Sequence, residues 1–90
     1  MSAVERVRAI ALLLPEVVER PTNEGADFLV DGKVFAQVVE SSAPAVRVRE
    51  AAGDVVVTLG DDADWTLVED RVARSWELTA PRRLLEAGGR

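Results

Sequence analysis

The segment ADFLVDGKVFAQVVE, residues 26–40, predicts a β-hairpin in the first half of the chain. Asp31 and Gly32 lie between two runs that are rich in β-branched and aromatic residues. An Asp-Gly pair in that setting is the strongest short-range signal for a two-residue hairpin turn. We therefore expect the two runs to form adjacent antiparallel strands.

The pairing across this turn sets which side chains share a face. Pairing the residues on either side of the turn puts Phe28 opposite Phe35 on one face. Leu29 then lies opposite Val34 on the other face. Both faces are substantially apolar, so either the hairpin is covered on both sides or one face meets a partner chain. The second face is the candidate interface, and its residues are Leu29, Val34, Ala36 and Val38.

Two further strands are predicted in the middle of the chain. AVRVRE, residues 45–50, has period-two alternation, which turns its valines inward and Arg47 and Arg49 outward. GDVVVTLG, residues 53–60, is a second β-favouring run, and the short connection before it predicts an antiparallel hairpin. With the first hairpin, these runs predict a sheet of about four strands.

A helix is predicted before the sheet. Ser2 followed by Glu5 forms a capping box, and apolar residues recur behind it at helical spacing. Pro15 disfavours helical dihedral angles in the residue before it. We expect this helix to cover residues 3–14, and we expect a loop at PTNEGAD, residues 21–27.

A second helix is predicted after the turn-forming run GDDAD. It begins near Asp64 or Thr66, and Thr66 would form a second capping box with Glu69. Its apolar residues step by three or four positions, which is typical of a helix packed on a core. Its two tryptophans are therefore expected in the core rather than as platforms for nucleic-acid bases. The apolar stripe is Trp65, Val68, Val72, Trp76 and Ala80.

The chain after this helix has two readings. Pro81 ends the helix and suits the first turn of a short third helix that buries Leu84 or Leu85. The arginines between them lie at the C-terminal end of the preceding helix, where the partial negative charge favours cations. Closure of the core is the first reading, and contact with a polyanion through Arg82 and Arg83 is the second.

Together these elements predict an α+β fold in one domain over residues 1–90. The order is one helix, the strands and then two helices, so the N- and C-terminal helices pack against an antiparallel sheet. Ninety residues are enough for one domain and too few for two.

The composition excludes most catalytic chemistry. The chain has no cysteine and no histidine, so it lacks a thiol nucleophile, the usual soft metal ligands and the commonest general base. Ser41, Ser42 and Ser75 have no histidine to activate them. The acidic residues before the second helix are expected to cap it. We therefore expect no catalytic residues, no metal site and no small-molecule cofactor.

The charge balance bears on partners and location. Sixteen acidic and eleven basic residues give a net charge of −5, which repels nucleic acid and anionic membranes at long range. The apolar run at residues 9–14 is too short for a signal peptide or a spanning helix, so we expect a cytoplasmic protein without membrane contact. Nucleic acid would need a local basic patch. Candidates are Lys33, Arg47, Arg49, Arg71, Arg74, Arg82 and Arg83.

Arg47 and Arg49 are the most credible pair among these candidates, because they share the exposed face of one predicted strand. The alternative is a solvated strand face without a ligand.

Three motifs resemble the MmcQ/YjbR-like family of small bacterial proteins. They are LPEV at residues 14–17, GKVFA at 32–36 and DDADWTLVEDRVARSWELTAPRRL at 61–84. The resemblance implies a frataxin-like (CyaY-like) two-layer sandwich, also called a double wing, for which DNA binding has been suggested. On such a shape, we expect the acids near the first strands to form a solvated edge rather than an iron-binding ridge. They are Glu16, Glu19, Glu24 and Asp27.

The chain departs from this family in one place. Family members usually carry a helix and a loop where only EAAGD, residues 50–54, joins two strands. The shortening predicts exposed apolar surface and a symmetric homodimer in which each sheet covers the other. Two hypotheses follow: a DNA-binding or regulatory protein, and a protein-interaction or dimerisation module without nucleic-acid binding.

Overall fold

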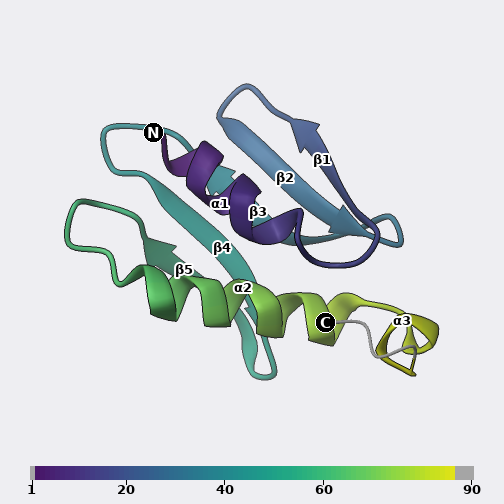
Figure 1. The fold of residues 1–90 in the computed structure, drawn as a ribbon. Coiled ribbons are helices and arrows are strands. Elements are labelled where there is room, and N and C mark those ends of the chain that lie inside the picture. Colours follow the sequence, from purple (N-terminus) through teal and green to yellow (C-terminus); the bar gives the residue numbers. More distant parts are fainter. Residues whose placement is uncertain (1, 87–90) are drawn as a thin grey trace.

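Residues 2–86, which the computed structural model describes, fold into one sheet and three helices (Figure 1). The helices are α1 (Ala3–Ala11), α2 (Trp65–Thr79) and α3 (Arg82–Glu86). The strands are β1 (Val17–Pro21), β2 (Gly25–Val30), β3 (Lys33–Val39), β4 (Ala45–Glu50) and β5 (Gly53–Thr58).

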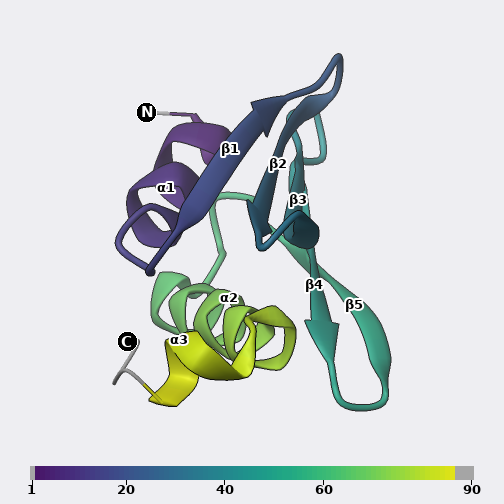
Figure 2. The same cartoon turned by 90° about the vertical axis from the view of Figure 1, so that its right-hand side faces the viewer.

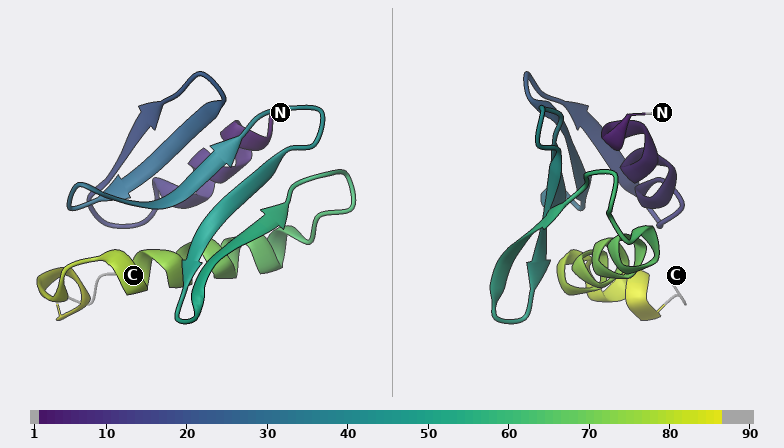
Figure 3. Two further views of the ribbon diagram at one scale, coloured as in Figure 1. Left: turned by 180° about the vertical axis from the view of Figure 1, so that it is seen from behind. Right: turned by 90° about the vertical axis from the view of Figure 1, so that its left-hand side faces the viewer.

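The strands form an antiparallel sheet in the order β1-β2-β3-β4-β5. The first helix packs against β2 and β3, and α2 packs against β3, β4 and α1. Both helices lie on the same side of the sheet (Figure 2). In the described part of the chain no helix covers the other side, which we call the open face (Figure 3). This is the predicted α+β fold, with five strands instead of about four.

The first strand, β1, is the element that the sequence prediction missed. It pairs with β2 from Val17 opposite Val30 to Pro21 opposite Ala26. Its five residues include two charges and a proline, which makes the strand pattern weak. Proline cannot donate a ladder hydrogen bond, so the sequence fits an edge strand and no other place in the sheet. The loop predicted here shrinks to residues 22–24.

The hairpin between β2 and β3 is confirmed. Asp31 and Gly32 have φ angles of 53° and 76°, in the left-handed region that a type I′ turn requires. Next to the turn, Leu29 lies opposite Val34, as the sequence predicts.

A β-bulge on β3 makes the rest of the predicted facing wrong. Phe28 lies opposite Ala36 and not opposite Phe35, because Phe35 is an extra residue on β3. The extra residue reverses the alternation, so Ala36 and Val38 face the helices and are buried in the core. These two residues therefore have no exposed surface to contribute to the predicted interface.

The core lies between the helices and the sheet. Trp76 of α2 is fully buried, and its Nε1 donates a hydrogen bond to the backbone oxygen of Pro15 at 3.1 Å. Trp65 is half-buried against the core, and the guanidinium of Arg6 lies 4.0 Å from its ring centroid. The other buried core residues are Val7, Ala11, Ala26, Phe28, Val30, Phe35, Ala36, Val38, Val46, Val48, Leu59, Val68, Val72 and Leu84.

The first helix begins as predicted and ends earlier. Ser2 and Glu5 form the capping box, with hydrogen bonds of 3.1 Å in both directions. The helix ends at Ala11, and residues 12–14 form turns with shorter-range hydrogen bonds. These turns redirect the chain into β1, so the predicted end at residue 14 is wrong.

The second helix is capped by Asp64, whose Oδ1 accepts from the amides of Thr66 and Leu67 at 3.1 and 3.2 Å. The second capping box predicted at Thr66 is therefore wrong, because Thr66 already lies inside the helix. In α3, Leu84 is buried and Leu85 is exposed. No helix among the described residues is long and apolar enough to cross a membrane.

Candidate functional site

The open face carries a row of side chains that crosses the whole sheet. Arg20 on β1 lies opposite Asp27 on β2, which lies opposite Gln37 on β3. Gln37 in turn lies opposite Arg47 on β4, and Arg47 lies opposite Val56 on β5. Neighbouring strands are about 4.8 Å apart, so adjacent members of this polar row are within side-chain reach of each other.

An apolar row lies beside the polar row. It consists of Val18, Leu29 and Val34, which are opposite one another on β1, β2 and β3. Val18 is 62% exposed, and the other two are half-buried. Leu29 and Val34 are thus the two predicted interface residues that remain at the surface, and the open face combines apolar and charged groups.

Asp27 is the least satisfied member of the polar row. Its Oδ2 accepts a hydrogen bond from Nη2 of Arg20 at 2.8 Å, and its side chain is only 6% exposed. Its Oδ1 is buried and has no hydrogen-bond partner among residues 2–86. The prediction of a solvated carboxylate is therefore wrong for Asp27. A buried carboxylate oxygen without a donor is destabilising.

A shallow depression of about 320 Å³ lies over this part of the open face. Arg47 and Arg49 line it, and neither forms an ion pair with another described residue. The depression thus brings two unpaired cations to the same surface as Val34 of the apolar row. Its polar lining is Arg20, Asp27, Gln37, Arg47, Arg49 and Asp54.

A serine from the helix layer bridges the ends of β3 and β4 beneath this depression. The Ser75 hydroxyl donates to the backbone oxygen of Phe35 and accepts from the amide of Arg49 at 2.8 Å. These two backbone groups lie next to the last β3–β4 pair, Ala36 opposite Val48. The hydroxyl therefore takes the place of the ladder contact, and the tip of the β4–β5 hairpin diverges from β3 (Figure 2).

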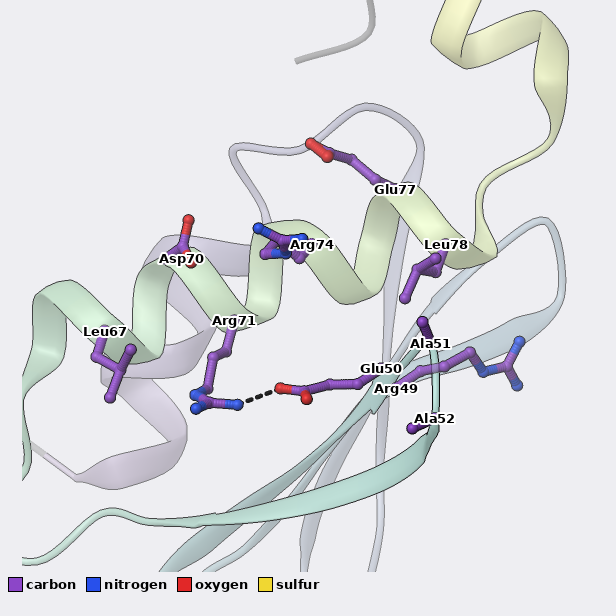
Figure 4. A pocket seen from close by; sticks show the side chains of 10 residues that line it. All are labelled: Arg49, Glu50, Ala51, Ala52, Leu67, Asp70, Arg71, Arg74, Glu77 and Leu78. Atoms are coloured by element: carbon purple, nitrogen blue, oxygen red, sulfur yellow. Dashed lines mark hydrogen bonds and ion pairs between the residues drawn. The ribbon is translucent and has the colours of Figure 1, made fainter.

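That divergence leaves a second hollow, of about 640 Å³, between α2 and the turn that joins β4 to β5 (Figure 4). An ion pair between Arg71 and Glu50 crosses it. The exposed side chains of Leu67 and Leu78 flank it. Arg49 and Arg74 also line this hollow, but Asp70 and Glu77 do so too. Its cations and acids are therefore equal in number, and it attracts an anionic ligand less than the open face does.

The basic residues predicted to bind nucleic acid are divided between different elements. Arg47 and Arg49 lie on the open face, as the sequence predicts. Lys33 follows the turn between β2 and β3. Arg82 and Arg83 belong to α3, which lies on the helix side of the sheet (Figure 2). Only Arg47 and Arg49 therefore belong to the depression.

The two arginines of α3 have carboxylate partners. Arg83 donates two hydrogen bonds to Glu16, at 2.9 and 3.1 Å, and Arg82 donates one to Glu86 at 3.0 Å. The hydrogen bonds from Arg83 lower the pKa of Glu16. The Arg83–Glu16 contact ties α3 to the residue before β1 and supports the role of α3 in closing the core, whereas the Arg82–Glu86 contact lies within α3.

Another predicted edge acid, Glu19, is also paired. It accepts two hydrogen bonds from Arg8 of α1, at 2.7 and 2.8 Å, and these bonds lower the pKa of Glu19. Within residues 2–86 no three acidic side chains come together as a group that could hold a metal ion. Two of the four acids of this edge, Glu16 and Glu19, thus link the helices to the strand layer.

No protein-family model, curated protein or solved structure matches the chain. The similarity to the MmcQ/YjbR-like family therefore stays a prediction from the sequence motifs.

Proposed function

We propose that this chain is a non-enzymatic binding domain that holds a segment of another protein on its open face. The observation that carries the proposal is the pair Arg47 and Arg49, which line a depression on the open face and form no ion pair with another described residue. A site with two unpaired cations beside an apolar row suits a ligand with both acidic and apolar groups.

A polypeptide supplies these groups together. Its Asp or Glu side chains can pair with the two guanidinium groups. Apolar side chains of the same segment can cover Val18, Leu29 and Val34, which form the adjacent row. The proposed partner is therefore a segment that carries both acidic and apolar residues.

Selection of displayed random peptides against the full chain tests this proposal. We expect enrichment of peptides that combine Asp or Glu with aliphatic or aromatic residues. The double variant Arg47→Glu/Arg49→Glu should weaken their binding at least tenfold. The matched double variant Arg82→Glu/Arg83→Glu changes the total charge equally on α3, and it should retain binding. Equal losses in both variants would contradict the assignment to the open face.

Asp27→Val gives a second test, because it removes a carboxylate from the depression and keeps both arginines. Selected acidic peptides should bind this variant at least as tightly, while its circular dichroism stays that of the native chain. Weaker binding would contradict recognition of acidic groups by this surface.

DNA binding in the cytoplasm is the second candidate function. Arg47 and Arg49 are unpaired among the described residues, and the MmcQ/YjbR-like motifs support a DNA-binding or regulatory role. Titration of duplex DNA at two salt concentrations decides this case. Phosphate contacts predict an affinity that falls steeply as salt rises and is lost in Arg47→Glu/Arg49→Glu. Absence of binding at low salt would exclude it.

A further inference from the structure

Strand β5 forms one edge of the sheet, and its outer backbone groups pair with no other described strand. The amide of Leu59 donates to the oxygen of Pro44 at 2.8 Å, which identifies a hydrogen-bonded pair of the β4–β5 ladder. Such pairs alternate with non-bonded ones, so every second residue of β5 directs its N–H and C=O away from β4. The outward-directed residues are Asp54, Val56 and Thr58.

This edge lacks the usual protection against pairing with another strand. β5 contains three consecutive valines, no proline, no lysine and no bulge within residues 53–58. The opposite edge strand, β1, contains Glu19 and Arg20 and ends at Pro21. The two edges are therefore not equivalent, and β5 is the one that can accept a further strand.

We propose that β5 pairs with β5 of a second copy of this chain, antiparallel, about a two-fold axis at Val56. In that register Val56 lies opposite its own counterpart, and Asp54 lies opposite Thr58 of the other copy. The outward-directed backbone groups of all three positions then form roughly six hydrogen bonds between the copies. With the two-fold axis at any other residue, fewer of these three residues would pair in each copy.

The side chains of β5 are compatible with this register. Asp54 is the one charged residue of the strand, and the two-fold axis at Val56 keeps it away from its own counterpart. Val55 and Val57 are half-buried on the helix side, and they would lie opposite each other across the interface. Val56 is 56% exposed on the open face and would lose part of this exposure to its counterpart. The strand is thus complementary to itself in charge and in shape.

The helix α2 packs mainly on strands other than the edge strand. It contacts β3 and β4 more than β5, and the groove beside it is flanked by exposed Leu67 and Leu78. A two-fold axis perpendicular to the sheet puts the helices of both copies on the same side. Side chains of the second copy can therefore cover these leucines while the strands pair.

This inference is independent of the ligand proposed for the open face. The dimer joins two open faces into one wider sheet surface without using Asp27, Arg47 or Arg49 as contacts. A chain that dimerises and binds no peptide would contradict the proposed function alone. A chain that binds peptide as a monomer would contradict the β5 pairing alone.

Sedimentation equilibrium of the full chain is the first test. The mass should rise with concentration from 9.7 kDa toward twice that value, over roughly 10 to 1,000 μM. Val56→Lys should keep the monomer mass, because two ammonium groups would face each other at the axis. The matched control is Val18→Lys on β1, which is 62% exposed and should still dimerise. A wild-type chain that stays monomeric, or a Val56→Lys variant that still dimerises, would overturn the proposal.

The register has its own test. A mixture of Val56→Lys and Val56→Glu should regain association, because opposite charges then meet at the axis. Since the chain has no cysteine, Val56→Cys should form an intermolecular disulfide under mild oxidation, and Val18→Cys should not. Equal cross-linking of both cysteine variants would overturn the register, whether or not the lysine variants fold well.

Discussion

The hydroxyl of Ser75 donates a hydrogen bond to the backbone oxygen of Phe35, the extra residue of the β3 bulge. The same hydroxyl accepts from the amide of Arg49, so a single side chain satisfies one group on each of two strands. A bulge leaves backbone groups without ladder partners, and buried groups of this kind need a substitute. Ser75 is that substitute, and its position in the fully buried face of α2 follows from this need.

Ser75→Ala should destabilise the fold by about 1–3 kcal/mol, because it leaves a buried carbonyl and a buried amide unsatisfied. Urea unfolding measures the change at constant m-value. Ser42→Ala is the control, since Ser42 is exposed in the β3–β4 loop and its loss should stay within about 0.5 kcal/mol. Equal stability of the two variants would show that the serine does not bridge the strands.

The ion pair on the open face should respond asymmetrically to mutation. Arg20→Ala leaves the buried carboxylate of Asp27 without its donor and should cost about 1–3 kcal/mol. Asp27→Val removes the buried charge from a β-strand position and should be neutral or stabilising by up to about 2 kcal/mol. Thermal unfolding of both variants checks this. A larger loss for Asp27→Val than for Arg20→Ala would mean that Asp27 is needed for folding.

Gly25 is required by close backbone packing between β2 and β3. A Cβ at this position would lie 2.1 Å from the backbone oxygen of Val38, too close for any side chain. Gly25→Ala should therefore destabilise the fold by roughly 1–3 kcal/mol, as other overpacked sites do. Gly60→Ala is the matched control, because a Cβ there meets nothing within 4 Å. Denaturant midpoints of the two variants should differ clearly.

Acid should weaken the link between α1 and β1. Hydrogen bonds from Arg8 lower the pKa of Glu19 in the folded chain below its ordinary value of 4.5. The ionised form therefore favours folding, and its contribution is complete above about pH 4.5 and is lost as the pH falls through the lowered pKa.

Glu19→Gln should reduce stability at pH 7 and make the loss below pH 4.5 shallower. Arg8→Met, which keeps the carboxylate and removes its cation, should flatten the same part of the curve. Unfolding free energies measured between pH 3 and 7 provide the comparison. An acid dependence unchanged by both substitutions would contradict the pairing.

Local patterns predicted most of the secondary structure correctly. The Asp31-Gly32 turn needs two left-handed residues, and few other pairs supply them, so the hairpin could be read directly. The alternation in β4 correctly placed Arg47 and Arg49 outward. Likewise, the capping box at Ser2 depends on residues three apart. Signals of this kind involve neighbours along the chain, so they can be recognised from the sequence alone.

The errors arise where distant segments act on one another. β1 has little strand pattern and exists because β2 offers it a partner. The bulge at Phe35 reverses the facing of Ala36 and Val38, and the hydroxyl that compensates it lies 40 residues away in α2. From the sequence alone, Ser75 was only a serine without a histidine to activate it, and nothing marked it as a bridge between strands.

The linear order of residues was enough to specify an α+β chain with a hairpin at Asp31-Gly32 and a tryptophan-bearing helix, since periodicity and turn chemistry are local. Folding in three dimensions settled which residues meet on the open face. Arg20, Asp27, Gln37 and Arg47 come from four strands, and register alone aligns them. Register depends on long-range pairing and on a single inserted residue, which no local pattern encodes.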